Sequence, residues 1–140
     1  MTNKNNILSK IYIASISGAL SIILGAFSAH GLENLVKQNI LSLHHFEVFE
    51  KAVKYQMYNS IILLILALAN FIVSQNIFKA SFYTLLIGMI LFSGSLYWIA
   101  LQSLIHIAFP KYLFWITPLG GLLMITGWIW IIVDIRKINR

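Results

Sequence analysis

Four long stretches of apolar residues, separated by short polar segments, dominate the pattern of the chain. They cover about residues 11–29, 57–73, 80–104 and 112–133, and none of them contains Asp, Glu, Lys or Arg. A helix of about 20 apolar residues is long enough to cross a hydrocarbon core of roughly 30 Å. The pattern therefore predicts four transmembrane helices.

The polar stretch at residues 31–54 is predicted to be a long loop on the outer side of the membrane. From Ser42 onward its apolar residues recur at helical spacing, beginning with Phe46, which is typical of an amphipathic helix. We expect this helix to lie at the outer interface and to run into the second span. Gly31, which follows the first span, is expected to end the first helix.

Composition supports the membrane prediction. Hydrophobic residues make up 59% of the 140 residues, and charged residues make up only 10%, whereas about 25% of the residues of a soluble domain are charged. Too few polar side chains remain to cover a surface exposed to water, so lipid must surround most of the chain. The expected fold is an all-α integral membrane protein, a compact four-transmembrane-helix bundle that forms a single domain.

The basic residues predict the orientation of this bundle. The net charge is +6, but the basic residues lie at helix ends and tails rather than along a face. This placement argues against nucleic acid as a partner and favours contacts with lipid headgroups. Because cytoplasmic segments carry an excess of Lys and Arg, we expect both termini to be cytoplasmic. The cytoplasmic set would comprise Lys4, Lys10, Lys79, Arg136, Lys137 and Arg140, and the outer set Lys37, Lys51, Lys54 and Lys111.

Small residues within the spans predict where helices approach closely. Every fourth position of one stretch in the first span is small: Ser17, Ser21, Gly25 and Ala29. Side chains four apart share one helix face, and small residues are enriched where membrane helices pack. The third and fourth spans contribute Gly94, Gly120, Gly121 and Gly127. We expect the first span to pack against the fourth, or against its own copy in a dimer.

Polar residues inside or beside the spans form the candidate site. Tyr55, Tyr58 and Asn59 share one helix face where the second span begins, at about the level of His30. The predicted cluster comprises His30, Tyr55, Gln56, Tyr58, Asn59, Ser93, Ser95, Tyr97 and Thr117. Polar groups in lipid must find partners. The cluster therefore forms either a hydrogen-bond network between helices or a pocket for a headgroup or small molecule.

No catalytic, metal or cofactor site is predicted. The histidines show no known ligand spacing, and the adjacent His44 and His45 would point about 100° apart on a helix. The chain has no cysteine, which excludes disulfides, thiolate metal sites and thiol nucleophiles. Ser93 and Ser95 flank Gly94 but do not form a nucleophile elbow, and the spans contain no Asp to orient a histidine. Missing intramembrane carboxylates and arginines also argue against an ion-coupled pump.

Four motifs occur in order along nearly the whole chain. They are Gly-Ala-Phe-x-Ala-His at 25–30, Tyr-Gln-x-Tyr at 55–58, Leu-Phe-Ser-Gly-Ser-Leu-Tyr at 91–97, and Thr-Pro-Leu-Gly-Gly at 117–121 with Gly127-Trp128. With these motifs the chain resembles the small bacterial inner-membrane proteins typified by YgdD and YwdK. The resemblance implies four transmembrane helices in the cytoplasmic membrane and no established activity. The chain departs from it at Asn59, where such proteins often have a histidine.

Three functional hypotheses remain open. The leading one is a non-enzymatic binding or accessory protein for a membrane protein partner, a lipid or a small amphiphile, built on the predicted cluster. The second is a small transporter or channel that acts as a homo-oligomer, which requires a continuous polar stripe that residues 61–69 do not supply. The third is a membrane enzyme directed at a lipid or quinone, with His30 as its acid-base group.

Overall fold

The computed structural model describes residues 2–73, 75–108, 110–111 and 114–136, and over these ranges it contains helices and turns but no strand. The four long helices are α1 (Thr2–Phe27), α3 (Leu43–Ile72), α4 (Lys79–Ile105) and α5 (Ile116–Ile135). A π-helical turn, η1 (Ser28–Leu32), and the short helix α2 (Glu33–Lys37) extend α1. Within these described ranges, four helical stretches are long and apolar enough to cross a membrane, so the predicted number of spans is confirmed.

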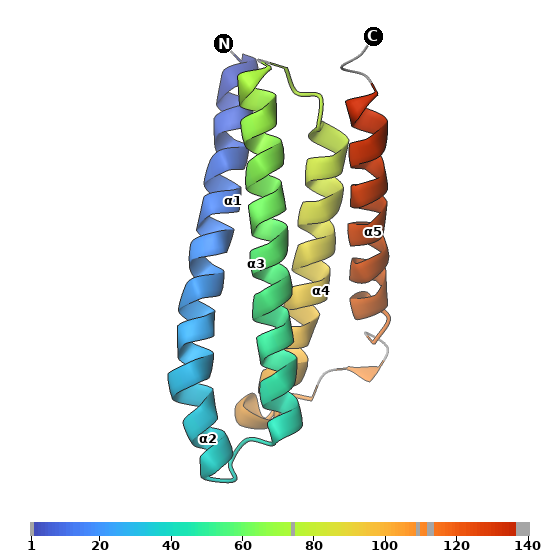
Figure 1. Cartoon of the computed structure of the whole chain (residues 1–140). Helices are drawn as coiled ribbons and strands as arrows, with labels where there is room; N and C mark the ends of the chain where they lie inside the picture. Colours follow the sequence, from blue (N-terminus) through green and yellow to red (C-terminus); the bar gives the residue numbers. More distant parts are fainter. Residues whose placement is uncertain (1, 74, 109, 112–113, 137–140) are drawn as a thin grey trace.

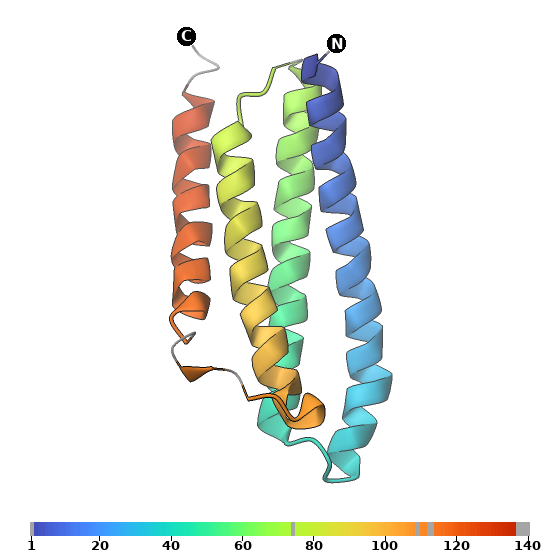
Figure 2. The same ribbon diagram turned by 180° about the vertical axis from the view of Figure 1, so that it is seen from behind.

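The long helices run antiparallel, and each packs on the next one in the sequence (Figure 1). The extensive contacts are those of α1 with α3, α3 with α4, and α4 with α5. In the described part of the chain, α1 and α5 share no such contact and lie at opposite edges of the row (Figures 1 and 2). The expected packing of the first span against the fourth is therefore wrong, because the fourth span packs on the third. Both termini lie at the same end of the bundle (Figure 1).

The first helix does not end at Gly31. The backbone passes through the wider π turn, in which the N–H of Glu33 donates to the carbonyl of Ser28, and remains helical to Lys37. A Cβ at Gly31 would lie 2.8 Å from the ring of Phe27. Gly31 thus provides space for an aromatic side chain one turn earlier rather than a helix stop, and its φ is not positive.

The predicted loop at residues 31–54 is helical except for the short connection at residues 38–42. Ser42 caps α3, since its hydroxyl accepts a 3.3 Å hydrogen bond from the backbone N–H of His45. The expected amphipathic helix is the first part of α3 itself, and it runs along the bundle instead of across its end (Figure 1). It packs by Val48 and Phe49 against Leu32 and Ala100.

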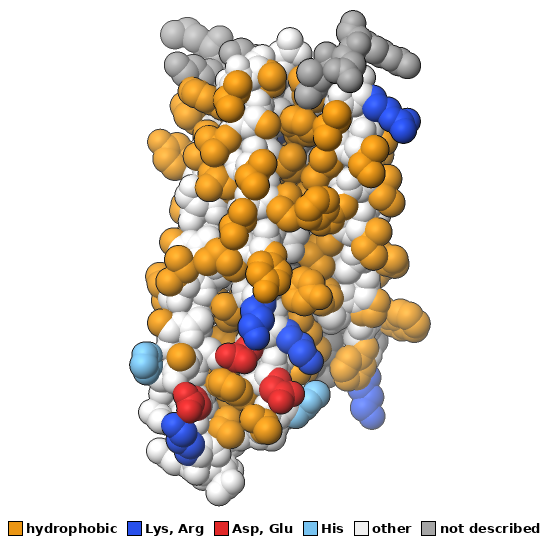
Figure 3. Space-filling model, viewed as in Figure 1, with side chains coloured by type: hydrophobic (Ala, Val, Ile, Leu, Met, Phe, Trp, Pro, Cys, Tyr) orange, Lys and Arg blue, Asp and Glu red, His pale blue; other side chains and the backbone are white. Residues whose placement is uncertain are grey.

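Charged residues of both signs gather at the end of the bundle made by α2 and the start of α3, on the face that Figure 3 shows. Glu33 and Lys37 pair at 2.8 Å along α2, and Glu50 and Lys54 pair at 3.9 Å along α3. The face beyond them, toward the termini, is mostly apolar (Figure 3). The charge pattern therefore places the tip made by α2 and the start of α3 outside the hydrocarbon core.

Glycines bring α4 and α5 into backbone contact. A Cβ at Gly120 would lie 2.5 Å from the backbone nitrogen of Phe92, and a Cβ at Gly127 would lie 2.5 Å from Leu85 Cγ. Gly88 faces Gly120 in the same contact, with its added Cβ 2.9 Å from the Gly120 oxygen. Such distances leave no room for a side chain, so these helices can pack this closely only with glycine.

The other small residues proposed for packing behave differently. On α1, Ser21 is buried and a Cβ at Gly25 would touch Val53 at 3.4 Å, but Ala29 is exposed. Positions four apart drift by about 40° at each step of a 3.6-residue helix, so the stripe turns away from α3 before Ala29. Gly121 meets only the Phe92 ring, at 3.8 Å, and an added Cβ at Gly94 meets nothing within 4 Å. Gly94 therefore does not mediate packing within the chain.

Candidate functional site

A polar layer separates two apolar cores of the bundle. The core nearer the termini includes Leu63 and Phe82, and the core at the opposite end includes Leu32 and Phe49. Between them lies Asn59, whose side-chain nitrogen is 3.2 Å from the sulfur of Met124 on α5. Met124 is eight residues from the start of α5, or about 12 Å along a helix. The layer therefore lies at hydrocarbon depth.

Gln56 is the centre of a hydrogen-bond network that joins three helices. Tyr97 on α4 donates its phenolic proton to Gln56 Oε1 across 2.7 Å, and Gln56 Nε2 donates to the backbone carbonyl of Ser17 on α1 across 2.9 Å. Ser60 Oγ lies 2.7 Å from the carbonyl of Gln56 and 2.8 Å from Ser17 Oγ. The network supplies partners for polar groups that would otherwise be costly in lipid.

A lateral groove of about 410 Å³ opens between α1 and α4 beside this network, and we call it groove 1. Its walls are mostly aliphatic side chains, and its polar lining comes from Ser17, Gln56, Ser93 and Tyr97. None of the described residues that line it is charged. The α1 and α4 side of the bundle faces the viewer in Figure 2.

Ser93 is the unusual member of this lining. It is 3% exposed, and its hydroxyl has no hydrogen-bond partner in the described part of the chain. Ser21, Ser60 and Ser95 each donate instead to a backbone carbonyl of their own helix. An unpaired buried hydroxyl costs about 1–3 kcal/mol, so the groove retains an unused hydrogen-bonding group.

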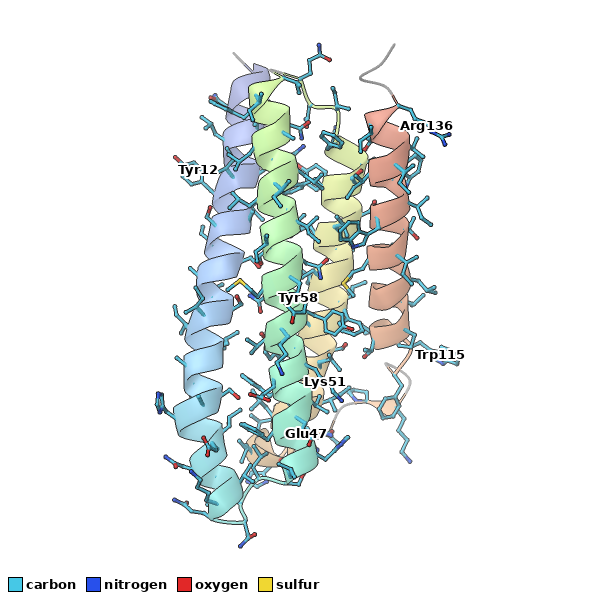
Figure 4. All side chains as sticks on the ribbon, in the orientation of Figure 1. Tyr12, Glu47, Lys51, Tyr58, Trp115 and Arg136 are labelled. Carbon is cyan, nitrogen blue, oxygen red and sulfur yellow. The ribbon has the colours of Figure 1, made fainter. Side chains whose placement is uncertain are left out.

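A second groove, groove 2, lies between α3 and α5 and has a volume of about 420 Å³. Its lining includes four aromatic side chains, those of Tyr55, Tyr58, Phe92 and Trp128. The rings of Tyr55 and Phe92 are 4.8 Å apart, and Asn59 donates to the carbonyl of Tyr55 across 2.8 Å. Tyr58 is 58% exposed, and Figure 4 shows it on the face that carries groove 2.

The nine residues predicted to form one cluster thus occupy separate places. Gln56, Ser93 and Tyr97 line groove 1, whereas Tyr55, Tyr58 and Asn59 line groove 2. Ser95 and Thr117 bond to each other across 2.7 Å and join α4 to α5. His30 is exposed on the π turn and lines neither groove.

A further polar layer, near the termini, is absent from the predicted site. Four of its residues are fully buried, one from each long helix: Lys10, Asn70, Ser81 and Asp134. Lys10 bonds through Nζ to Asn76 Oδ1 and lies 5.2 Å from the ring centres of Phe82 and Tyr83.

The partners in this layer cross between helices. Ser81 on α4 donates to Asp134 Oδ2 on α5 across 2.6 Å, and Asn70 Oδ1 accepts from the N–H of Phe78 across 3.0 Å. The Asn70 side-chain nitrogen has no partner among the described residues. One sequence signal was available, because Asp134 is the only aspartate in the chain.

The histidines do not assemble into a metal centre in the described part of the chain, where no group of three His, Cys, Asp or Glu residues is close enough to hold an ion. His45 Nδ1 instead lies 2.8 Å from Ser42 Oγ at the start of α3. His106 ends α4 with a left-handed φ of 54°.

Comparison with known proteins identifies the family. The family model described as "Protein of unknown function (DUF423)" matches residues 24–121. The chain belongs to this family. It is 38% identical over 127 residues to a UPF0382 membrane protein of Staphylococcus haemolyticus, covering 91% of this chain and 94% of the relative. A UPF0382 membrane protein of Haemophilus influenzae is 36% identical over 118 residues, covering 84% and 85% of the two chains.

No solved structure matches the chain. The names of the relatives agree with the four apolar helices, and the DUF423 chain is a multi-pass membrane protein that lies in the lipid bilayer. The family carries no established activity, so a function has to be inferred from the grooves and the polar layers.

Proposed function

We propose that this DUF423 protein is a non-enzymatic membrane protein that binds an amphiphilic molecule in groove 1. The groove is open to the side of the bundle, and its volume of about 410 Å³ falls within the range of roughly 300–1,000 Å³ of small-molecule sites. Apolar walls suit a hydrocarbon body, and the polar lining at hydrocarbon depth suits a molecule that is not purely hydrocarbon.

The observation that carries this proposal is the free hydroxyl of Ser93. Buried polar groups in proteins almost always have partners, and Ser93 could have donated to its own helix as Ser95 does. An unpaired hydroxyl in the wall of an open groove offers a hydrogen-bonding group to a ligand in that groove, which supports binding there.

The alternatives have less support. A transport path would need polar groups between the Gln56 network and the terminal layer, but there Leu63 and Leu66 pack into the apolar core. An enzyme that uses His30 would need that side chain near a groove, and it lines neither.

The finer identification with the YgdD and YwdK group remains part of this proposal. It rests on the four motifs, and three of them contribute groove residues: Gln56 and Tyr55 from the second, Ser93 and Tyr97 from the third, and Gly121 from the last. A membrane protein partner or a second copy of the chain is the competing occupant of the exposed helix faces.

Native mass spectrometry of protein released gently from its own membrane tests the proposal. The variant Gly94→Leu places a side chain into groove 1 where an added Cβ meets no atom within 4 Å, so the fold should tolerate it. We expect the unaltered chain to carry a bound amphiphile and Gly94→Leu to lose it.

Gly121→Leu is the matched control, because Gly121 lines groove 2. It should retain the molecule. Loss of the molecule from Gly121→Leu but not from Gly94→Leu would contradict the assignment to groove 1. A chain that carries nothing, or only a second copy of itself, would contradict binding of an amphiphile.

A further inference from the structure

We infer that groove 1 selects uncharged molecules whose apolar body carries a hydroxyl or carbonyl group. This inference rests on the proposed function and adds the chemical class of the ligand. It follows from the hydrogen-bonding groups left free in the groove, from their depth, and from the absence of charge among the described residues that line it.

The free groups are a donor and an acceptor one helical turn apart. Ser93 and Tyr97 are separated by four residues on α4 and both line groove 1, since side chains at this spacing share a face. The Ser93 hydroxyl is unpaired and can both donate and accept. Tyr97 commits its proton to Gln56, which leaves its oxygen as an acceptor. A ligand hydroxyl can use both groups, and a ligand carbonyl can accept from Ser93.

An ionised ligand group would find no opposite charge at this depth. The polar layer lies about 12 Å along α5 from its start, where an unpaired charge is expensive. Lys10 is seven residues before Ser17 on α1, which is about 10 Å along the helix, and it is already engaged with Asn76 and two aromatic rings. A carboxylate or phosphate would therefore be excluded.

Gly94 provides the side entrance for such a molecule. It is exposed beside the buried Ser93, and the space around it is empty to 4 Å from an added Cβ. Ile13 and Ile16 on α1 and Ile90 on α4 line the same groove and offer apolar contact for the body of the ligand. A molecule dissolved in the bilayer can thus enter sideways without crossing the charged tip of the bundle.

Photolabelling of the full chain in nanodiscs of uncharged lipid tests the inference. The probes are three diazirine-bearing eight-carbon chains that end in a hydroxyl, a methyl or a carboxylate group. Peptide mass spectrometry compares labelling at residues 13–20 and 86–97, which include the groove walls, with labelling at the lipid-facing residues Leu122 and Ile129 of α5. Since one net hydrogen bond is worth about a five-fold preference, we expect the alcohol to label groove 1 about five-fold more than either other probe.

Three variants separate the effect of the hydrogen bond from the effect of the space in the groove. Ser93→Ala should reduce the preference for the alcohol over the alkane, and the preference that remains is the contribution of the Tyr97 oxygen. Ser95→Ala, which alters a bond between α4 and α5, should leave the preference intact. Gly94→Leu should suppress labelling by all three probes. Equal labelling by the three probes, or a preference for the carboxylate, would overturn the inference and leave the proposed function standing. Labelling of groove 1 no stronger than that of Leu122 would overturn both.

Discussion

The phenol of Tyr97 donates a 2.7 Å hydrogen bond to the side-chain oxygen of Gln56 and so links α4 to α3 beside groove 1. Tyr97→Phe removes the hydroxyl that donates this hydrogen bond and leaves Gln56 Oε1 without that donor. We expect the free energy of unfolding to fall by about 0.6–2 kcal/mol, the range of hydrogen bonds between membrane helices. Unfolding of both proteins in mixed detergent micelles measures this difference in the free energy of unfolding. Tyr12→Phe is the control, because Tyr12 is 65% exposed, and an equal effect of both changes would contradict the role of the bond.

The glycines of α4 and α5 should respond to alanine in opposite directions. Gly120→Ala places a Cβ 2.5 Å from the backbone nitrogen of Phe92. Because backbone cannot move aside as a side chain can, the helices must separate, at a cost of about 2 kcal/mol or more. Gly94→Ala meets nothing and should stabilise α4 by up to about 1 kcal/mol through helix propensity. Thermal unfolding of the two variants in one detergent gives the comparison. A destabilised Gly94→Ala would show that this position has a packing partner.

Ser93 and Ser95 differ in whether the folded chain uses their hydroxyls. In delipidated protein, Ser93→Ala should leave the free energy of unfolding unchanged or raise it by about 1 kcal/mol, because it removes an unpaired buried group. Ser95→Ala should lower it by about 1 kcal/mol, because Ser95 bonds to Phe92 and Thr117. Equal destabilisation by both changes would mean that Ser93 has a structural partner after all.

The orientation with both termini inside is a prediction from the distribution of Lys and Arg, and labelling tests it cleanly because the chain has no cysteine. Asn39 lies in the connection before α3, and Arg136 follows α5 at the opposite end of the bundle (Figure 4). In intact cells, a membrane-impermeant maleimide should label Asn39→Cys and spare Arg136→Cys until the cells are opened. The reverse pattern would invert the topology.

The sequence was sufficient for the spans because apolar length alone decides which helices suit a bilayer. It was not sufficient for the ends of the helices. Gly31 looks like a helix stop, but its missing side chain instead provides space for the Phe27 ring. The ring of Phe27 in turn packs on the ring of Phe49 of α3, with the ring centres 6.2 Å apart. The sequence around either residue does not indicate a contact between two helices.

The polar residues in and beside the spans predicted the members of the candidate site. The packing of the helices, however, distributes those members over separate places. Gln56 and Asn59 are only about 60° apart around α3, yet they line different grooves because α4 packs on α3 between the two grooves. Lys10 and Asp134 each lie at the edge of an apolar stretch, where a charged residue usually faces water or lipid headgroups. Their burial depends on neighbouring helices that bring Asn76 and Ser81 to them, and spacing within one helix cannot reveal that.

The most direct test of the central claim is a density map of the protein in nanodiscs made from lipids of its own membrane. Binding of an amphiphile in groove 1 predicts an elongated non-protein density between α1 and α4, with its polar end within hydrogen-bond distance of Ser93 Oγ. The same density should be missing from a map of Gly94→Leu. A groove that shows only the disordered lipid found around α5, or one filled by a helix of a second copy, would contradict the claim.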